Sequence, residues 1–247
     1  MINDLENKTI FITGSSSGIG FGLAKRFLEA NNRVIICSKN IKKLKLASKN
    51  LDNCFYVQAD LTLDKDIEKA IKKIKSKKIT IDVLICNYGN SNYKKNNLDF
   101  NHAFENNFFS TVNTINMSLP IIRKKTGKII CISSICGVEH IKNAPIAYSV
   151  AKSAINNYVK LMSHSLSNKG IVINSIAPGN IYFKGSVWEK KMKKSRKKTE
   201  NYIKENVPMN KFGSIDDVYA LCRYLCSESN FTNGTTHILD GGQVKRF

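Results

Sequence analysis

Short apolar runs alternate with amphipathic stretches along the whole chain. The runs contain many β-branched residues and are typical of buried strands; they cover residues 8–13, 33–37, 54–59, 82–86, 127–132, 171–177 and 235–239. Apolar residues at helical spacing predict helices over residues 21–30, 64–76, 99–123, 146–166 and 214–227. Strands that alternate with helices predict an α/β fold, a doubly wound parallel sheet of about seven strands with helices on both faces.

The length of 247 residues suits one large α/β domain. No Pro/Gly/Ser-rich linker or internal repeat divides the sequence, so we expect a single domain over residues 1–247. The start, residues 1–8, is polar and lacks the order of a signal peptide. No apolar run approaches the ~20 residues of a membrane span. These features predict a cytoplasmic protein with no membrane partner.

The net charge of +20 invites a nucleic-acid interpretation. Lysine far outnumbers arginine, however, and is scattered among asparagine and isoleucine without any RNA- or DNA-binding motif. We therefore expect no nucleic-acid partner. An anionic small-molecule substrate or cofactor is the electrostatic partner that the composition favours.

Cysteine usage indicates a reduced protein. The seven cysteines are an odd number without a Cys-x-x-Cys pair, and they stand at positions 37, 54, 86, 131, 136, 222 and 226. We expect them to be buried small hydrophobes. Cys222 and Cys226 share helical spacing, but no histidine or further cysteine is near them in sequence, so no metal site is predicted.

A glycine-rich loop follows the first expected strand directly. It has the sequence Thr13-Gly-Ser-Ser-Ser-Gly-Ile-Gly20 and opens into a helix. Strand, glycine turn and helix in this order form a phosphate cradle, because glycines let backbone N–H groups approach a pyrophosphate at the helix N-terminus. The alternative is an ordinary tight turn between a strand and a helix.

The end of the second strand is where such folds discriminate their cofactor. A carboxylate there binds the ribose 2′-hydroxyl of NAD, whereas a cation accepts the 2′-phosphate of NADP. The sequence has no acid at this point and places Lys39 there, with Lys42 and Lys43 nearby. This favours NADP(H) over NAD(H), although Lys39 could equally face solvent.

Tyr148 and Lys152 are four residues apart and share one face of an expected helix. A phenol titrates near pH ~10, and a neighbouring ammonium lowers that pKa, so the pair can form a general acid and base. The alternative is an amphipathic helix with a half-buried tyrosine. The glycine turn, Asn87, Ser134 and Pro178 all follow strand ends, which parallel topology brings to the edge of the sheet where ligands bind.

These motifs, in this order and over nearly the full length, resemble the short-chain dehydrogenase/reductase family with its Rossmann-like fold. The matching positions are Thr13-Gly14-x-x-x-Gly18-Ile19-Gly20, Asp60, Asn87, Gly89, Asn107, Ser134, Tyr148, Lys152, Pro178-Gly179 and Asp240-Gly241-Gly242. The resemblance implies cofactor contacts from Gly14, Ser16, Ser17, Gly18, Ile19, Gly20, Ser38, Lys39, Asp60, Leu61, Asn87, Gly89, Tyr148, Lys152, Pro178, Gly179 and Ile181.

The resemblance also implies catalytic roles. Tyr148 would exchange a proton with the carbonyl or alcohol oxygen, and Lys152 would lower its pKa and hold the nicotinamide ribose. Ser134 would donate a hydrogen bond to the substrate oxygen. Asn107 would hold the water that connects Lys152 to solvent. The hydride belongs to the cofactor.

Several positions depart from the family pattern. Tyr88 replaces the small alanine of the Asn-Ala-Gly turn, and we expect it to shape the substrate side of the site or to alter the position of the bound cofactor. Cys86 replaces a common asparagine. Ser17 stands where many NADP-dependent relatives carry arginine, which weakens the preference for NADP. The usual threonine after Pro178-Gly179 is missing, so we expect backbone atoms to replace its contact with the nicotinamide amide.

Residues 182–212 stand where the family places its substrate lid. This segment is basic, with Lys190, Lys191, Lys193, Lys194, Arg196, Lys197 and Lys198 against Glu189, Glu200 and Glu205. It could cover an anionic substrate, such as a phosphorylated or nucleotide-linked sugar, or meet an acidic carrier protein; otherwise it is a solvated basic helix. The runs Pro178-Gly-Asn-Ile and Trp188-Glu-Lys-Lys resemble relatives from bacterial surface-glycan pathways.

The sequence thus predicts an NAD(P)(H)-dependent oxidoreductase that acts on a ketone or secondary alcohol of a small anionic metabolite. One alternative is a 3-oxoacyl-acyl-carrier-protein reductase. An alternative of another class is a non-catalytic NADP-binding regulator. The resemblance further implies a homo-dimer or homo-tetramer built through the helices that carry Asn107 and Tyr148.

Overall fold

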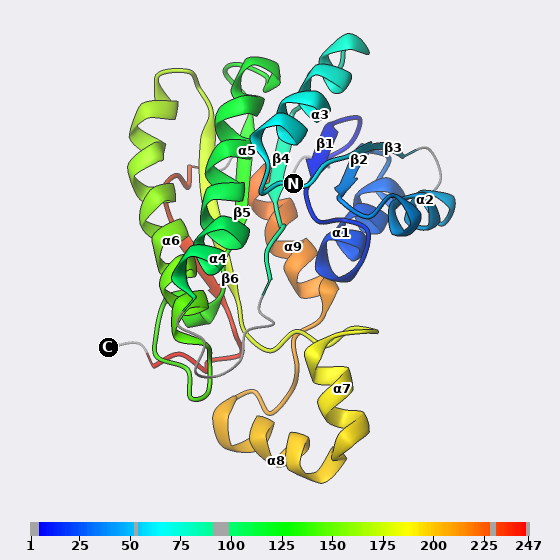
Figure 1. Cartoon of the computed structure of the whole chain (residues 1–247). Coiled ribbons are helices and arrows are strands. Elements are labelled where there is room, and N and C mark those ends of the chain that lie inside the picture. The colour runs from blue at the N-terminus through cyan, green and yellow to red at the C-terminus, as the bar shows by residue number, and fades with distance from the viewer. Residues whose placement is uncertain (1–4, 52–53, 91–98, 228–230, 246–247) are drawn as a thin grey trace.

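A single parallel sheet of seven strands organises the protein. The computed structural model describes residues 5–51, 54–90, 99–227 and 231–245, so residues 1–4 of the polar start lie outside the described part. The strands run β1 (Thr9–Ile12), β2 (Arg33–Ser38), β3 (Phe55–Gln58), β4 (Val83–Cys86), β5 (Lys128–Ile132), β6 (Val172–Pro178) and β7 (Thr236–Leu239). Their order in the sheet is β3-β2-β1-β4-β5-β6-β7, as Figure 1 shows. This order confirms the expected doubly wound sheet. It places the reversal of strand order, where such folds form their ligand crevice, between β1 and β4.

Helices cover both faces of the sheet. The helical segments are α1 (Gly18–Glu29), α2 (Ile41–Lys49), α3 (Asp64–Ser76), α4 (Phe100–Phe104), α5 (Ser110–Ser118), α6 (Ile146–Ser167), α7 (Val187–Lys194), α8 (Arg196–Asn206) and α9 (Ile215–Cys226). One buried cluster joins α1, α2 and α9 to the sheet, and the other joins α3, α5 and α6. In Figure 1, α7 and α8 lie together beyond these layers.

The strand sequences are apolar throughout because both faces are buried. Ile10 and Ile12 of β1 face the cluster under α1, whereas Phe11 between them faces the cluster under α3 and α6. All three side chains are at most 1% exposed. Successive residues of the strand therefore pack into the two clusters in turn. This explains why the strand is apolar at every position and does not alternate between apolar and polar residues.

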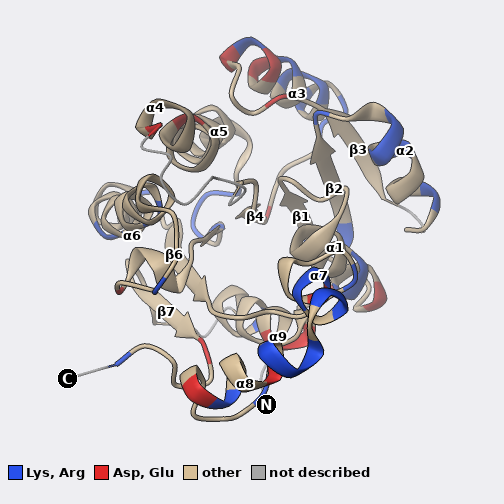
Figure 2. Cartoon of the chain, turned by 60° about the horizontal axis from the view of Figure 1, so that its bottom comes forward, with Lys and Arg blue, Asp and Glu red and all other residues tan. Residues whose placement is uncertain are grey.

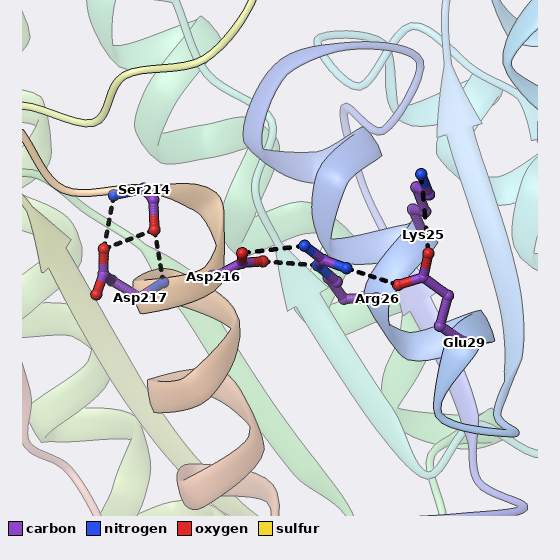
Figure 3. Close-up of polar contacts among 6 residues, drawn as sticks. All are labelled: Lys25, Arg26, Glu29, Ser214, Asp216 and Asp217. Atoms are coloured by element: carbon purple, nitrogen blue, oxygen red, sulfur yellow. Dashed lines mark hydrogen bonds and ion pairs between the residues drawn. The ribbon is translucent and has the colours of Figure 1, made fainter.

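Helices α1 and α9 pack side by side on one face of the sheet. The rings of Phe27 and Tyr219 meet edge to face with centroids 4.9 Å apart. At the rim, Arg26 donates to both carboxylate oxygens of Asp216 at 2.6 and 3.0 Å, as Figure 3 shows. Ser214 and Asp217 form a capping box that fixes the start of α9. These contacts hold the glycine loop, which begins α1, against the sheet.

The single helix expected over residues 99–123 is wrong in detail. Between α4 and α5 the structure has a π-helical turn, Glu105–Phe109, and the last turn, Leu119–Ile121, is a 3₁₀-helix. The amides of Asn106 and Asn107 donate to the carbonyl oxygens of His102 and Ala103, four residues back. Side chains thus compete with backbone N–H groups for those oxygens, which accounts for the wider turn.

Two other features differ from expectation. Helix α2 follows β2 where no helix was predicted, and Asn40 caps it by accepting from the N–H of Lys43. All seven cysteines are free as expected, but Cys54 and Cys136 are only partly buried. Within the described residues, no helix is long and apolar enough to cross a membrane, and no group of three His, Cys, Asp or Glu side chains is placed to hold a metal ion.

Removing the ring of Phe27 should destabilise the fold. Phe27 is 0% exposed between α1, α9 and the sheet, so Phe27→Ala leaves a cavity and should lower the free energy of unfolding by about 3–5 kcal/mol in urea denaturation. Phe231→Ala is the matched control, because Phe231 is fully exposed at 103% and its loss should change that free energy by less than about 0.5 kcal/mol. Equal effects of the two substitutions would contradict the assigned core.

Candidate active site

The glycine loop between β1 and α1 forms a tight cradle. Gly14 has a φ of +62°, and a Cβ at this position would lie 2.8 Å from the Cα of Tyr88. A Cβ on Gly20 would lie 2.5 Å from Nδ2 of Asn87. Only glycine allows these approaches, which bring the loop against the turn that follows β4.

The turn after β4 is tied to the loop by hydrogen bonds. Asn87 donates through Nδ2 to the carbonyl oxygens of Thr13 and Gly14 at 3.0 and 3.2 Å. The hydroxyl of Thr13 accepts the backbone N–H groups of Asn87 and Tyr88, each at 3.0 Å. The two strand ends on either side of the crevice are therefore one hydrogen-bonded unit.

The start of α1 fits an anionic group. Ser17 is the N-cap residue but makes no side-chain capping bond, and the first turn contains no acidic residue. Its first residues, Gly18 and Ile19, therefore present backbone N–H groups and the positive end of the helix dipole to a ligand. Together with the space left by the glycines, this arrangement fits the pyrophosphate of a dinucleotide.

Polar side chains gather at the ends of β2 and β3, where the adenosine part of a dinucleotide would lie. Ser16 donates to the hydroxyl oxygen of Ser38 at 2.9 Å, and Nζ of Lys39 lies 3.4 Å from Oδ2 of Asp60. Burial opposes ionisation of Asp60, but hydrogen bonds from Thr62 and the charge of Lys39 outweigh it and lower its pKa.

Lys152 is the buried cation of the site. Its side chain comes from α6, is 3% exposed as a residue, and donates from Nζ to the carbonyl oxygen of Ile132 at 2.9 Å. Burial lowers its pKa to about 8. The hydroxyl of Ser133 donates to the backbone carbonyl of Lys152 at 3.2 Å, and a Cβ on Gly137 would lie 2.5 Å from its carbonyl carbon. The end of β5 and the turn after it thus fix this lysine.

Tyr148 lies beside the buried lysine, and Ser134 follows the strand end that the lysine contacts. The ring centroid of Tyr148, one helical turn before Lys152, is 5.8 Å from Nζ. Ser134 directly follows Ser133 at the end of β5, and its hydroxyl oxygen accepts the N–H of Cys136 at 3.2 Å. Ser134 is 9% exposed, whereas Tyr148 is half-buried. The structure therefore brings the phenol ring of Tyr148 and the ammonium of Lys152 together, and it places Ser134 two residues after Ile132, whose carbonyl oxygen accepts from Lys152.

Gly89 packs against both Asn107 and Lys152, so the two side chains lie close together. A Cβ on Gly89 would lie 2.7 Å from Oδ1 of Asn107 and 3.2 Å from Nζ of Lys152. The π-helical turn carries Asn107 to this point, and its side chain exchanges two hydrogen bonds of 3.1 Å with the backbone of Asn90. The turn after β4 consequently reaches both the glycine loop and the buried cation.

Tyr88 does not occupy the crevice in the way its size suggested. Its hydroxyl donates to Oδ1 of Asn106 at 2.9 Å, and its ring packs against the cluster under α5 and α6. Its backbone, at the Cα, is what faces Gly14. The bulky replacement of alanine thus braces the π-helical turn that carries Asn107.

The remaining predicted residues contribute mainly backbone. Leu61, Pro178 and Ile181 have buried side chains. Gly179 is partly exposed and donates its N–H to the carbonyl oxygen of Leu239 at 2.9 Å. Ile181 pairs with Gly213 in an isolated parallel bridge, which closes the base of residues 182–212.

Two residues of the site were not predicted from the sequence in the roles that the structure gives them. Thr13, which the sequence marks only as part of the glycine motif, accepts two hydrogen bonds through its hydroxyl. Asn90, which no motif marks, bonds to Asn107 through its backbone. A threonine at the end of a strand that precedes a glycine loop is a usable signal, because its hydroxyl can accept from a neighbouring turn. Asn90 acts through its backbone, which leaves no signal in its side-chain type.

Comparisons with known proteins show the family of the chain. The model described as "Enoyl-(Acyl carrier protein) reductase", which falls within the short-chain dehydrogenase/reductase family, matches residues 14–243. The L-fucose dehydrogenase of Bos taurus is 26% identical over 243 residues, covering 95% of this chain and 88% of its own length. The 3-oxoacyl-acyl-carrier-protein reductase of Rickettsia typhi is 28% identical over 248 residues, covering 98% of each chain.

Solved structures share the fold along the full length. The L-sorbose reductase from Gluconobacter frateurii, solved with NADPH and L-sorbose, has a TM-score of 0.89 at 23% identity, with 100% of both chains covered. An NADPH-bound short-chain oxidoreductase from Pseudomonas aeruginosa has a TM-score of 0.87 at 20% identity, covering 98% of this chain and 100% of its own. The chain therefore belongs to the short-chain dehydrogenase/reductase family, whose members are oxidoreductases that act on CH–OH groups.

Proposed function

We propose that this protein transfers hydride between NADP(H) and a ketone or secondary alcohol of a small anionic metabolite, a sugar or a nucleotide-linked sugar. The observation that carries the proposal is the junction at Gly89. There Nζ of Lys152 and Oδ1 of Asn107 lie 3.2 and 2.7 Å from the position that a Cβ on Gly89 would take. The ring of Tyr148 lies next to the same Nζ atom.

In this proposal the side chains transfer the proton and stabilise the charge that develops on the substrate oxygen. The nicotinamide, when bound, supplies or accepts the hydride. Tyr148 gives its phenolic proton to the carbonyl oxygen during reduction and takes a proton from the alcohol during oxidation. Ser134 donates a hydrogen bond to the same oxygen and stabilises the negative charge that develops on it. Asn107 holds the water through which the proton on Tyr148 is replaced.

Lys152 makes the phenol a usable acid and base. An ammonium group near Tyr148 favours the phenolate, so it lowers the tyrosine pKa. Because burial lowers the pKa of Lys152 itself to about 8, the lysine is cationic around neutral pH and loses its charge as the pH rises. We propose that Lys152 also holds the nicotinamide ribose.

The preference for NADP(H) rests on the end of β2. Lys39 is the cation next to the expected ribose, and the hydroxyl of Ser38, which accepts from Ser16, keeps its own O–H as a donor for a 2′-phosphate. The pairing of Lys39 with Asp60 at 3.4 Å is compatible with this role, because the lysine side chain is still 60% exposed.

We further propose that residues 1–247 form one domain in which residues 182–212 act as a substrate lid. The acidic side chains of the lid are largely neutralised within it, since Glu189 pairs with Lys193 and Glu200 pairs with Arg196. In the described part of the chain Lys190, Lys194, Lys197, Lys198 and Lys204 have no ion pair. Figure 2 shows the many Lys and Arg positions along α7 and α8, and this excess of positive charge favours an anionic substrate.

Two relatives divide the substrate hypotheses. The L-fucose dehydrogenase relative supports a sugar, whereas the 3-oxoacyl-acyl-carrier-protein reductase relative supports an acyl thioester on an acidic carrier. The excess lysines of the lid suit a phosphorylated or nucleotide-linked sugar, and they equally suit an acidic carrier protein. A non-catalytic regulator is the third hypothesis, and the retained Ser134, Tyr148 and Lys152 speak against it.

A homo-dimer or homo-tetramer completes the proposal. Ile146, Val150 and Leu161 of α6 are 56%, 43% and 62% exposed, and their spacing places them on one face of the helix. Phe109, at the start of α5, is 48% exposed. Exposed apolar side chains on these two helices support an interface between copies of the chain.

Replacing Tyr148 by phenylalanine should remove turnover but keep cofactor affinity. Only the proton-transfer group is lost, so kcat should fall about 100-fold or more while the Kd for NADPH stays within about twofold. The assay follows the absorbance of the reduced nicotinamide with keto-sugars, phosphorylated and nucleotide-linked sugars and an acyl-thioester ketone.

Tyr158→Phe is the matched control for that experiment. Tyr158 lies on the same helix, and its buried hydroxyl has no hydrogen-bond partner among the described residues, so its loss should leave kcat within about twofold. Full turnover in Tyr148→Phe would refute the mechanism. Firm NADPH binding by the wild-type protein without reduction of any member of the panel would favour the regulator.

Lys39→Asp should reverse the cofactor preference. The carboxylate repels a 2′-phosphate and accepts a ribose 2′-hydroxyl, so the Kd for NADPH should rise at least about tenfold while that for NADH stays equal or falls. Fluorescence titration with both reduced cofactors measures this. Lys42→Asp makes the same charge change on α2 and should alter both values by less than about threefold. Equal loss for NADH and NADPH in Lys39→Asp would argue against the assignment.

The titration of Lys152 should appear in the stability of the protein without cofactor. The amine has a pKa of 10.5 ordinarily and of about 8 in the folded chain, so between these values the unfolded chain binds more protons. Wild-type stability should therefore rise with pH across this window relative to Lys152→Met, by up to about 3 kcal/mol. Urea denaturation of both proteins from pH 8 to pH 10.5 measures the difference. A constant difference would contradict the buried amine.

A further inference from the structure

Three loops at the amino ends of the strands carry a large excess of positive charge. They are residues 75–82 before β4, 122–127 before β5 and 167–171 before β6, and together we call them the amino-end surface. The charged residues of this surface are Lys75, Lys77, Lys78, Asp82, Arg123, Lys124, Lys125 and Lys169. The cationic residues are all exposed, and the single carboxylate, Asp82, already pairs with Arg123.

Backbone contacts hold the three loops together. The N–H of Arg123 donates to the carbonyl oxygen of Ile81 at 2.8 Å, which ties the first loop to the second. The N–H of Lys125 donates to the carbonyl oxygen of Lys169 at 2.9 Å, which ties the second loop to the third. A Cβ on Gly170 would lie 2.4 Å from the Cα of Lys125, so these two loops are in direct contact. The fold therefore gathers cations from three separate segments of the sequence.

The charges of the amino-end surface are left unbalanced. A cation at a helix C-terminus complements the helix dipole, and two of the loops directly follow α3 and α6. One or two cations would meet that need, however, and none of the lysines of the surface forms an ion pair with a described residue. Like charges on tied loops repel one another, so the binding of a polyanion would relieve that repulsion.

The amino-end surface lies at the edge of the sheet opposite the candidate active site. Asn87, Ser134 and Pro178 stand at the carboxyl ends of β4, β5 and β6, whereas the three loops stand at the amino ends. At ~3.3 Å per residue, strands of this length separate the two edges by about 15 Å. In Figure 1 the ends of α3, α5 and α6 lie at the upper edge, away from α7 and α8. A ligand of this surface would therefore leave the cofactor crevice free.

The uncharged side chains of the amino-end surface suit phosphates and sugars better than lipid. The exposed ones include Thr80, Thr126, Ser167 and Asn168, whose hydroxyl and amide groups are of the kind that contacts a nucleic-acid backbone. Within these loops, all of which the structure describes, no large hydrophobic side chain is exposed. A surface that binds a membrane needs such side chains to enter the acyl boundary.

One exposed aromatic ring adjoins the cations. Asn233 donates from Nδ2 to the hydroxyl oxygen of Ser167 at 3.0 Å, which ties residues 231–235 to the third loop. Phe231, two residues before Asn233, is fully exposed at 103%. Lysines that neutralise a phosphate backbone, next to an aromatic ring on which a base can stack, are the combination that binds single-stranded nucleic acid.

We propose that the amino-end surface binds single-stranded nucleic acid. Lysines of the three loops neutralise its phosphates, and Phe231 stacks on one of its bases. The sequence predicts no nucleic-acid partner because its lysines are scattered without a motif, but the fold gathers lysines of three segments on one surface. This inference is independent of the proposed oxidoreductase function, since it uses none of the residues assigned to that function.

Fluorescence anisotropy with labelled oligo-uridine RNA and oligo-thymidine DNA of about 12 nucleotides tests the proposal. The wild-type protein should bind both strands with a Kd of about 10 μM or lower at physiological salt, and more weakly as salt rises. In the triple variant Lys77→Glu, Lys124→Glu and Lys169→Glu, the Kd should rise at least about tenfold. The slope of log Kd against log salt should fall by about 2, as expected for three lost phosphate contacts at ~0.7 each.

A second triple variant is the matched control. Lys45→Glu, Lys65→Glu and Lys69→Glu make the same change of net charge at exposed positions of α2 and α3, outside the three loops, and should raise the Kd less than about threefold.

Phe231→Ala tests the proposal if the first triple variant does not fold, because its exposed ring contributes little to the fold. The Kd should rise about fivefold while the salt slope stays the same, since stacking releases no counterions. An unchanged Kd in Phe231→Ala would overturn the stacking role.

Four other results would overturn the proposal. The first is a wild-type protein that binds neither strand, and the second is an equal loss of affinity in the two triple variants. The third is displacement of the strand by saturating NADPH, which should leave the Kd within about twofold because the crevice lies at the other edge. The fourth is binding to phosphatidylserine vesicles through the same lysines without binding to either strand. Hydride transfer, measured separately with the substrate panel, stands or falls independently of these results.

Discussion

The hydrogen bond from the ammonium of Lys152 to the carbonyl oxygen of Ile132 is the contact on which the site depends. A buried cation costs several kcal/mol unless polar groups compensate it. Here the end of β5 supplies an acceptor, and the close approach of Gly137 seats α6 against that end. The same contact therefore sets the height of α6 above the sheet and the place of Tyr148 beside the crevice.

The crevice exists because the sheet is parallel and its strand order reverses between β1 and β4. Right-handed crossovers bring the carboxyl ends of all strands to one edge, so loops far apart in sequence become neighbours. Thr13 and Asn87 join the two central strand ends by hydrogen bonds. Gly89, two residues after Asn87, packs closely against Asn107 and Lys152. The turn after β4 thus hydrogen-bonds to the glycine loop on one side and packs closely against Asn107 and Lys152 on the other.

Residues 182–212, which we propose as a lid, are held differently from the strand ends around Lys152. The segment is held at its base by the bridge between Ile181 and Gly213 and within itself by stacked aromatic rings. Two hydrogen bonds, from Met209 to Gly241 and from Gln243 to Tyr202, join it to the C-terminal segment. Lys191 completes this stack, with Nζ 4.0 Å above the ring centre of Trp188, and partial burial lowers its pKa. A segment tied at its ends and packed on itself can move as a unit, which suits an element that closes over ligands.

The sequence by itself determined the fold and the identity of the groups that meet at the site. Continuous apolar runs gave all seven strands to within two residues, since a strand buried on both faces must be apolar throughout, and the motif order pointed to the family. Only the tertiary structure decided where Tyr88 turns its ring, why the helix before α5 widens at Asn107, and that Phe183 rests on Gly18. Such features depend on contacts between residues up to 165 positions apart, as Gly18 and Phe183 are, and local propensity carries no information about which distant side chain will fill the adjoining space.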